Sequence, residues 1–314
     1  MGLGLAALGR PGYINIGHQE HLGSDRSKEG MESNARSVLD AAWESGIRYF
    51  DAARSYGLAE YFLSTWLNNR KIPKDEITIA SKWGYVYTAD WRVHVKQHEV
   101  KRHTLKNFKD QLLETQELLG SYLNLYQIHS ATLESGVLTN TAVLNAMAHL
   151  KECGIKLGLS VSGIDQAKTI DKSLEIKVDG IILFDAVQAT WNIMETSATN
   201  ALKEAKNLGM LVIVKEALAN GRILNPGHKQ QHIFRHIYDY CEQTNCTLDA
   251  FALAVPLSKP YIDIVLSGAS NAMHLRSNVK SLLVKPDSLD LKILQELVQE
   301  PATYWKERSQ LSWN

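Results

Sequence analysis

The stretch LNLYQIHSATLESGVLTNTAVLNAMAHLKECGIKLGLSV, residues 123–161, contains the pattern that decides the fold. An apolar run at 123–128 has the Leu, Ile and Tyr content of a buried strand, and an amphipathic helical pattern follows over 138–153. Gly154 stands just past this helix, where a glycine commonly ends one, and a second apolar run occupies 155–161. Short strands that alternate with helices predict a parallel sheet.

The same unit recurs along the whole chain. Eight strand–helix units in succession, with no linker between two halves, predict a single (β/α)₈ TIM barrel domain over residues 1–314. An open doubly wound sheet is the alternative, but it usually has fewer strands. Extra outer helices are expected at 248–255 and 289–299. The strands are expected at 3–8, 47–51, 77–81, 123–128, 155–161, 181–187, 210–215 and 262–266, and the barrel helices at 33–46, 57–70, 100–119, 138–153, 165–174, 196–208, 229–243 and 271–283.

The composition excludes several classes of protein. The 314 residues include 34 basic and 34 acidic side chains, and this balance argues against a nucleic-acid binder and against a disordered chain. Cys153, Cys241 and Cys246 form no C-x-x-C pair, which is typical of reduced thiols inside the cell. We find neither a signal peptide nor an apolar run near the 18 residues that a membrane helix needs, so a cytoplasmic location is expected. The oligomeric state is not predicted.

Titratable side chains stand where three consecutive predicted strands end. Asp51 ends the second strand and Tyr56 follows it, Lys82 ends the third strand, and His129 ends the fourth. Any one of them alone is commonly a helix cap, a solvated charge or a packed core residue. Active sites of such barrels lie at the carboxyl ends of the strands, however, and these ends converge. We therefore expect the four side chains to form one site.

The four side chains suit proton transfer. A free tyrosine has a pKa near 10, and a neighbouring lysine ammonium is expected to lower the pKa of Tyr56. Asp51 would keep Lys82 charged, and His129 would hydrogen-bond the oxygen that receives the proton. No nucleophile–base pair and no metal-ligand cluster accompanies them, which disfavours a metal-dependent hydrolase or lyase. The reacting electrons are expected to come from a nicotinamide by hydride transfer.

Three motifs carry a family resemblance: FDAARSYG at 50–57, IASKWG at 79–84 and LYQIHS at 125–130. They resemble the catalytic motifs of the aldo-keto reductase superfamily, and the likeness extends over residues 3–283. The resemblance implies a (β/α)₈ barrel that binds NAD(P)H without a Rossmann domain. It also implies a catalytic tetrad of Asp51, Tyr56, Lys82 and His129, in which Tyr56 is the general acid and base.

Four later segments resemble the cofactor motifs of this family. LGLSVSG and VQATWN imply contacts to the nicotinamide carboxamide, VKEALANGR implies a cover for the pyrophosphate, and VLSGASNAMHLRSN implies the site of the adenosine 2′-phosphate. The last segment opens a helix, whose free N–H groups favour an anion. The family's usual stacking aromatic is replaced here by a lysine, at 215. The cofactor is expected to be NADP, with NAD possible. The implied residues are Ser160, Gln188, Lys215, Glu216, Ala217, Leu218, Asn220, Gly221, Arg222, Ser267, Gly268, Ala269, Ser270, Arg276 and Asn278.

The sequence therefore predicts an NADP-dependent oxidoreductase that interconverts a carbonyl (an aldehyde, ketone or sugar) and an alcohol. The alternative is a non-catalytic, nucleotide-binding regulatory subunit on the same fold, because some relatives in this family serve as channel subunits. No metal, nucleic acid or membrane partner is expected. Aromatic residues in the loops after the first and third strands are expected to wall the substrate site; they are Tyr13, Trp83, Tyr85, Tyr87 and Trp91.

Overall fold

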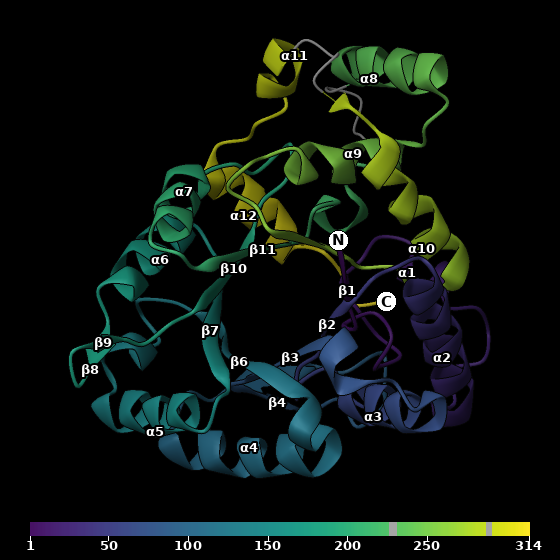
Figure 1. Cartoon of the computed structure of the whole chain (residues 1–314). Coiled ribbons are helices and arrows are strands. Elements are labelled where there is room, and N and C mark those ends of the chain that lie inside the picture. Colours follow the sequence, from purple (N-terminus) through teal and green to yellow (C-terminus); the bar gives the residue numbers. More distant parts are fainter. Residues whose placement is uncertain (226–230, 287–290) are drawn as a thin grey trace.

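The computed structural model describes residues 1–225, 231–286 and 291–314. Within these residues, eight parallel strands close into a barrel, in the spatial order β1–β2–β3–β6–β7–β10–β11–β12. The barrel is closed by β1, which pairs with both β2 and β12. Figure 1 looks along the barrel, with the strands around its centre and the helices outside. The strands are β1 (Gly2–Gly4), β2 (Tyr49–Asp51), β3 (Thr78–Trp83), β6 (Leu123–Ala131), β7 (Lys156–Val161), β10 (Ala186–Thr190), β11 (Leu211–Lys215) and β12 (Ile264–Ser267).

Helices cover the outer face of the barrel, as the alternating pattern predicts. Those between successive strands are α2 (Lys28–Glu44), α3 (Ala59–Arg70), α4 (Leu105–Leu119), α5 (Thr141–Glu152), α6 (Gln166–Leu174), α7 (Thr199–Asn207) and α9 (Leu248–Leu257), and α10 (Ala272–Val279) follows the last strand. Further helices are α1 (His18–His21), α8 (Gln231–Thr244), α11 (Leu291–Gln295) and α12 (Pro301–Ser309). Two small hairpins add β4 (Tyr85–Tyr87) with β5 (Glu99–Lys101), and β8 (Lys177–Val178) with β9 (Ile181–Ile182).

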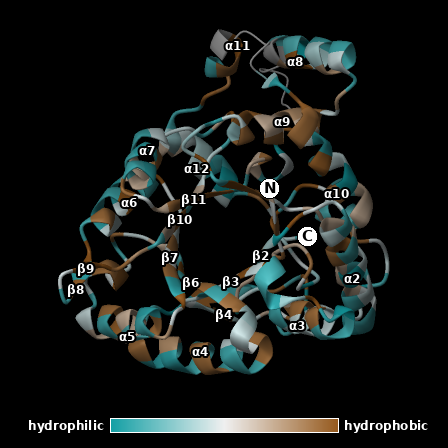
Figure 2. Ribbon diagram, in the orientation of Figure 1, coloured by the Kyte–Doolittle hydropathy of each residue, from teal (hydrophilic) through white to brown (hydrophobic). Residues whose placement is uncertain are grey.

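The sixth barrel strand lies later in the chain than its predicted range of 181–187. The barrel strand is β10, in register with β7 through Gln188 and Ser160. Ile181 and Ile182 instead form one side of a peripheral hairpin, where they are 66% and 39% exposed. This hairpin is visible as an apolar segment at the edge of the molecule in Figure 2. The prediction was wrong because hydrophobicity alone does not distinguish an exposed apolar turn from a buried strand.

The roles of two predicted helices are exchanged between β11 and β12. The prediction made 229–243 the barrel helix and placed 248–255 outside it. In the structure every residue of α9 from Ala250 to Pro256 is buried, whereas α8 lies beyond α9 on the outside (Figure 1). The mixed polarity of α8 and the apolar surface of α9 in Figure 2 agree with these positions. Residues 229–230 and 289–290 of the predicted helices lie outside the described residues.

Two N-terminal elements also differ from their predicted bounds. The first strand was expected over 3–8 but ends at Gly4, because the amides of Leu8 and Gly9 both donate to the carbonyl of Leu5 and turn the chain. The first long helix begins five residues earlier than expected, at Lys28. Its N-cap is Ser27, whose hydroxyl accepts a hydrogen bond of 3.0 Å from the amide of Gly30.

The inside of the barrel is built in layers. An apolar cluster within it consists of Tyr49, Ala80, Leu125, Ala186, Ile213 and Leu266, each from a different strand. Side chains two residues apart on a strand face the same side. The layer above this cluster is therefore made by the residues two positions further on, which are Asp51, Lys82, Gln127, Gln188, Lys215 and Gly268. The strand register thus brings polar side chains together directly above an apolar floor.

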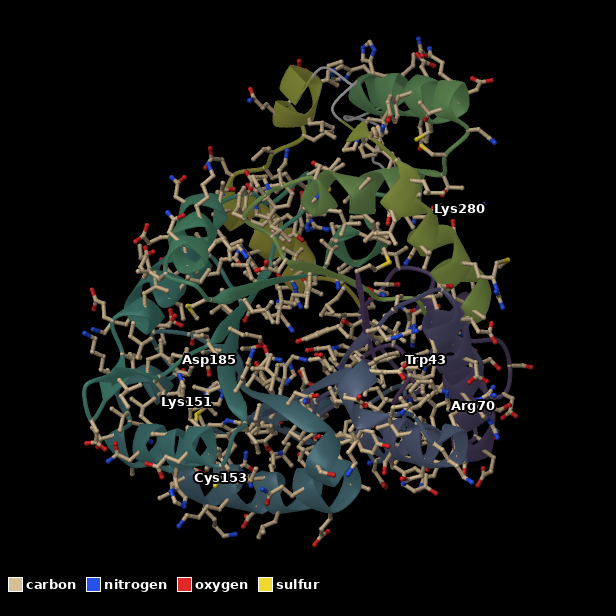
Figure 3. The ribbon with its side chains drawn as sticks, in the orientation of Figure 1. Trp43, Arg70, Lys151, Cys153, Asp185 and Lys280 are labelled. Atoms are coloured by element: carbon tan, nitrogen blue, oxygen red, sulfur yellow. The ribbon has the colours of Figure 1, made fainter. Side chains whose placement is uncertain are left out.

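Cys153 lies at the outer end of α5, away from the barrel interior (Figure 3). The described residues contain no helix long and apolar enough to cross a membrane.

Candidate active site

Asp51 is the centre of the polar layer. Its carboxylate accepts hydrogen bonds from the ammonium of Lys82, from Gln127 Nε2 at 3.2 Å and from Gln188 Nε2 at 2.9 Å. Lys82 is fully buried and Asp51 is 2% exposed, so the two charges form an ion pair away from water. The ammonium of Lys82 also donates to the carbonyl of Ala52 at 2.9 Å. A buried charge needs partners of this kind to remain ionised.

Tyr56 lies directly above this pair. Lys82 Nζ donates to the Tyr56 hydroxyl at 3.4 Å, as expected from their positions after neighbouring strands. The net effect on the phenol differs from the expectation, however. Desolvation raises the pKa of Tyr56 well above its usual value, and the Asp51 carboxylate raises it further, while Arg10 opposes both. Because Asp51 pairs with Lys82, the ammonium does not act on the phenol as an uncompensated charge, and the Tyr56 phenol is protonated at neutral pH.

His129 completes the group at the end of the apolar part of β6. Its ring meets the Tyr56 ring edge-on, with 5.4 Å between centroids, and its Nδ1 lies 3.3 Å from the hydroxyl of Ser55. Desolvation lowers the pKa of His129 well below its usual value, and the charge of Lys82 acts in the same direction. The imidazole is therefore neutral at pH 7, and one ring nitrogen can donate a hydrogen bond to a bound oxygen.

A second charged group stands at the end of β11. Lys215 Nζ donates to the hydroxyl of Thr190 at 2.9 Å, and desolvation lowers the pKa of Lys215 to about 8. Glu216 follows with a positive φ of 55° and pairs with Arg308 of α12, with 2.5 Å between Oε1 and Nη2. Desolvation opposes ionisation of Glu216, but Arg308 and Lys215 outweigh it and hold its pKa at about 2. This pair ties the C-terminal helix to the mouth of the barrel.

A cavity of about 940 Å³ connects these groups with the start of α10. Asp51, Tyr56 and His129 line one end of it. At Gly268 a side chain would meet nothing within 4 Å, so the backbone there is open to a ligand. The residues with predicted cofactor roles that line the cavity are Gln188, Lys215, Glu216, Ala217, Leu218, Asn220, Gly221, Ser267, Gly268, Ala269, Ser270 and Asn278.

Three predicted cofactor residues lie elsewhere. Ser160 is fully buried, and its hydroxyl accepts a hydrogen bond of 2.8 Å from the amide of Ser130. Arg222 pairs with Glu307 at 2.9 Å, outside the cavity lining. Arg276 also lies outside that lining; its side chain is 63% exposed and approaches Glu44 to 4.0 Å. Their roles toward a cofactor stay predictions.

The structure adds residues that the sequence analysis missed. Arg10, Asp249, Arg308 and Trp313 all line the cavity, and Gln127 donates a hydrogen bond to Asp51 from the same layer of the barrel. Period-two spacing from Leu125 could have indicated Gln127, and a lone arginine in the apolar N-terminal segment could have indicated Arg10. Nothing local marks Trp313, whose neighbours in space, Arg10, Tyr13 and His98, lie far from it in the sequence.

The predicted aromatic walls are present only in part. Tyr13 and Tyr85 line the cavity. Trp83 is fully buried in the core, and Trp91 donates its indole N–H to the carbonyl of Arg26 at 2.8 Å. In addition, the ring of Trp313 stacks on His98, with 4.0 Å between centroids.

The closed parallel barrel, with Asp51, Tyr56 and His129 at one end of its cavity, agrees with the family that the three sequence motifs indicate. The sequence model described as "Aldo/keto reductase family" matches residues 12–299, and the chain belongs to this family. It is therefore an oxidoreductase of carbonyl and alcohol substrates, in a family that uses NAD(P)H.

Individual relatives are distant. The chain is 23% identical to D-threo-aldose 1-dehydrogenase of a Pseudomonas species over 310 residues, covering 89% of this chain and 90% of the relative. It is 21% identical to NADH-specific methylglyoxal reductase of Escherichia coli (strain K12) over 292 residues, covering 84% of this chain and 86% of the relative. The holo form of aldo-keto reductase AKR11C1 from Bacillus halodurans has the same fold, with a TM-score of 0.69 at 20% identity and coverage of 96% of this chain and 92% of the other.

Proposed function

We propose that the protein is an NADP-dependent reductase of aldehydes, ketones or sugars, and that Tyr56 is its general acid, or its base in the reverse direction. The observation that carries this proposal is the contact of the Tyr56 hydroxyl with the buried Lys82–Asp51 pair, at the end of the cavity that His129 also lines. A carbonyl oxygen at this end can accept hydrogen bonds from both the phenol and the imidazole.

Each residue has a distinct part in proton transfer. Tyr56 donates its proton to the carbonyl oxygen as negative charge develops there, and the nearby ammonium of Lys82 then stabilises the tyrosinate. Asp51 holds Lys82 in place, and the neutral His129 orients the oxygen. The bound nicotinamide supplies the hydride. In the reverse direction the tyrosinate takes the proton of the alcohol.

The chain's own groups fit the nicotinamide end of such a cofactor. Because Gln188 Nε2 donates to Asp51, the amide is oriented with its oxygen as the free acceptor. An acceptor that lines the cavity suits the N–H₂ group of a carboxamide. The Gln188 amide takes this orientation because an ionised carboxylate can only accept hydrogen bonds. The orientation supports the predicted role of Gln188.

At the other end of the cavity, the backbone from Ser267 to Ser270 and the open position at Gly268 offer donors to a phosphate. Asp249 supplies a carboxylate near Asn278 at this end of the cavity. We assign Asp249 the role of accepting a hydrogen bond from the exocyclic amine of the adenine. The choice of NADP over NAD rests on Ser270 and Arg276.

The names of the relatives suggest small aldehydes and aldoses as first substrates to test. The experiment is a screen of aldehydes, ketones and sugars with NADPH and with NADH, and of alcohols with the oxidised cofactors, followed by absorbance of the reduced nicotinamide. Tyr56→Phe is the matched control. It should lower kcat by about 10²–10⁴-fold, which is the usual contribution of general acid catalysis, and leave the Kd of NADPH nearly unchanged.

Two outcomes would contradict the proposal. Retention of more than about a tenth of the wild-type kcat in Tyr56→Phe would exclude Tyr56 as the main acid. Tight binding of NADPH with no turnover of any carbonyl or alcohol would favour the regulatory alternative.

A further inference from the structure

We propose that Arg10 is a positioning residue for Tyr56, acting as a second cation that favours the deprotonated phenol. This inference rests on the proposed function, because it assigns Tyr56 the proton transfer. A phenol that gives up its proton becomes an anion, so a nearby fixed cation assists the step in both directions.

Arg10 is held close to the Tyr56 ring. Its guanidinium carbon lies 5.3 Å from the centroid of that ring, and the residue is 2% exposed. The same carbon lies 4.6 Å from the indole of Trp313 and 5.6 Å from the ring of Tyr13. A cation enclosed by three aromatic rings is poorly screened by water, so its field acts on the phenol with little attenuation.

The hydrogen bonds of Arg10 also hold the loop that carries Tyr56. Arg10 Nη1 donates to the carbonyl of Ser55 at 2.7 Å and to Glu99 Oε2 at 2.8 Å. Ser55 precedes Tyr56 in the chain, and its hydroxyl lies 3.3 Å from Nδ1 of His129. The Arg10 guanidinium therefore holds the residue that precedes Tyr56 in the chain and whose side chain contacts His129.

The remaining charges around Tyr56 are largely paired. Asp51 is paired with Lys82, and Glu216 is paired with Arg308. Arg10 is paired with Glu99, but the two are unequally screened, since the side chain of Arg10 is 3% exposed and that of Glu99 is 21% exposed. The buried partner should dominate at the phenol. The further titratable groups facing this region are His129, Lys215, Tyr13 and Tyr85.

The Arg10–Glu99 ion pair allows a test in which two variants are expected to shift the pKa at position 56 in opposite directions. Arg10→Met and Glu99→Gln both remove the Arg10–Glu99 ion pair, although the amide oxygen of the glutamine can still accept a hydrogen bond from Arg10. Their electrostatic effects are opposite, because one variant removes a cation and the other removes an anion. We expect the pKa at position 56 to rise by about one unit in Arg10→Met and to fall by a smaller amount in Glu99→Gln. Arg10→Lys retains the cation and should restore much of the wild-type value.

The first readout is kcat/KM for alcohol oxidation at a fixed pH below the optimum, where the rate follows the tyrosinate fraction. It should fall about tenfold in Arg10→Met, which corresponds to one pKa unit, and rise in Glu99→Gln. The second readout needs no turnover. A fluorinated tyrosine, whose phenol is more acidic, is incorporated at position 56, and its ionisation is followed by ¹⁹F NMR in each variant.

Shifts of the same sign in both variants, or no shift in Arg10→Met, would overturn the role of Arg10. If Arg10→Met fails to fold, the test rests on Glu99→Gln. An unchanged or raised pKa at position 56 in that variant would overturn the role of Arg10. Opposite NMR shifts in a protein that turns over no substrate would contradict the proposed function but leave the action of Arg10 on Tyr56 intact. Normal turnover, together with NMR shifts of the same sign in both variants, would support the proposed function and overturn the role of Arg10.

Discussion

Gln188 Nε2 lies 2.9 Å from Oδ2 of Asp51, so a residue with a predicted cofactor role is hydrogen-bonded across the barrel to a residue with a predicted catalytic role. The two side chains come from β10 and β2, which are not neighbours in the sheet. Gln127 donates to the same oxygen from β6 at 3.2 Å. The orientations of Gln188 and Lys82 therefore depend on one carboxylate.

Gln188→Met should weaken NADPH binding and also destabilise the fold. The variant removes a donor to a buried carboxylate, which lowers the free energy of unfolding by about 1–3 kcal/mol, and it removes the acceptor that faces the cavity. Isothermal titration and urea unfolding measure the two effects. Gln127→Met is the matched control, because it removes a donor to the same oxygen from a residue that does not line the cavity. Equal loss of NADPH affinity in both variants would exclude a direct contact of Gln188 with the cofactor.

Lys82→Met should be among the most damaging single changes. It leaves Asp51 buried without its counter-ion, and breaking a buried pair lowers the free energy of unfolding by about 3–5 kcal/mol. The double variant Asp51→Asn, Lys82→Met should regain part of this loss, which urea unfolding can measure. In the single variant the apparent pKa for alcohol oxidation should rise, since the tyrosinate loses its nearest cation. Additive losses in the double variant would contradict the coupling of the two residues.

Arg308→Met should destabilise the protein in a way that depends on pH. The pKa of Glu216 is held at about 2 in the folded protein, below its ordinary value of 4.5, so its ionisation stabilises the fold above about pH 4.5. That contribution is lost as the pH falls from about 4.5 toward 2. The gap in stability between wild type and Arg308→Met should therefore be several kcal/mol at neutral pH and shrink in acid. Lys106→Met, which breaks an exposed pair on α4, should change stability by less than about 0.5 kcal/mol. A gap independent of pH would show that Arg308 acts through packing.

Lys215 should make the binding of the oxidised cofactor depend on pH. Its ammonium has a pKa of about 8 and lines the cavity, so it is charged below about pH 8 and repels a cationic nicotinamide. The affinity for NADP⁺ should rise as the pH increases through this value, whereas that for NADPH should change little. Fluorescence titrations of both cofactors can compare wild type with Lys215→Met, in which the rise should disappear. Parallel pH profiles for the two cofactors would place Lys215 away from the nicotinamide.

Arg276→Ala should weaken NADPH more than NADH if Arg276 reads the 2′-phosphate. A charge-assisted contact of this kind contributes about 1.5–3 kcal/mol, so the Kd of NADPH should rise by about tenfold or more. Glu44→Gln removes the nearby carboxylate and should leave NADPH binding equal or slightly stronger. Equal effects of Arg276→Ala on both cofactors would assign the selectivity to Ser270 and the backbone of the Ser267–Ser270 segment.

The sequence alone determined the barrel and the expected place of its active site. Strand–helix alternation is a local pattern that needs no knowledge of contacts, and Asp51, Lys82 and His129 follow apolar runs that are read directly from the chain. Period-two spacing then stacks the polar residues above an apolar floor. The motif resemblance led to the same family that the matched sequence model identifies.

Tertiary structure decided those features that depend on contacts between residues far apart in the sequence. Ile181 and Ile182 have a strand's composition but lie in an exposed hairpin, and only closure of the sheet selects β10 as the sixth strand. Likewise, α9 rather than α8 covers the barrel. The protonation of Tyr56 also could not be predicted, because burial, Asp51 and Arg10 act on it together through space. Arg10 and Trp313 meet from opposite ends of the chain, and no local pattern encodes the electrostatic effect of such a contact.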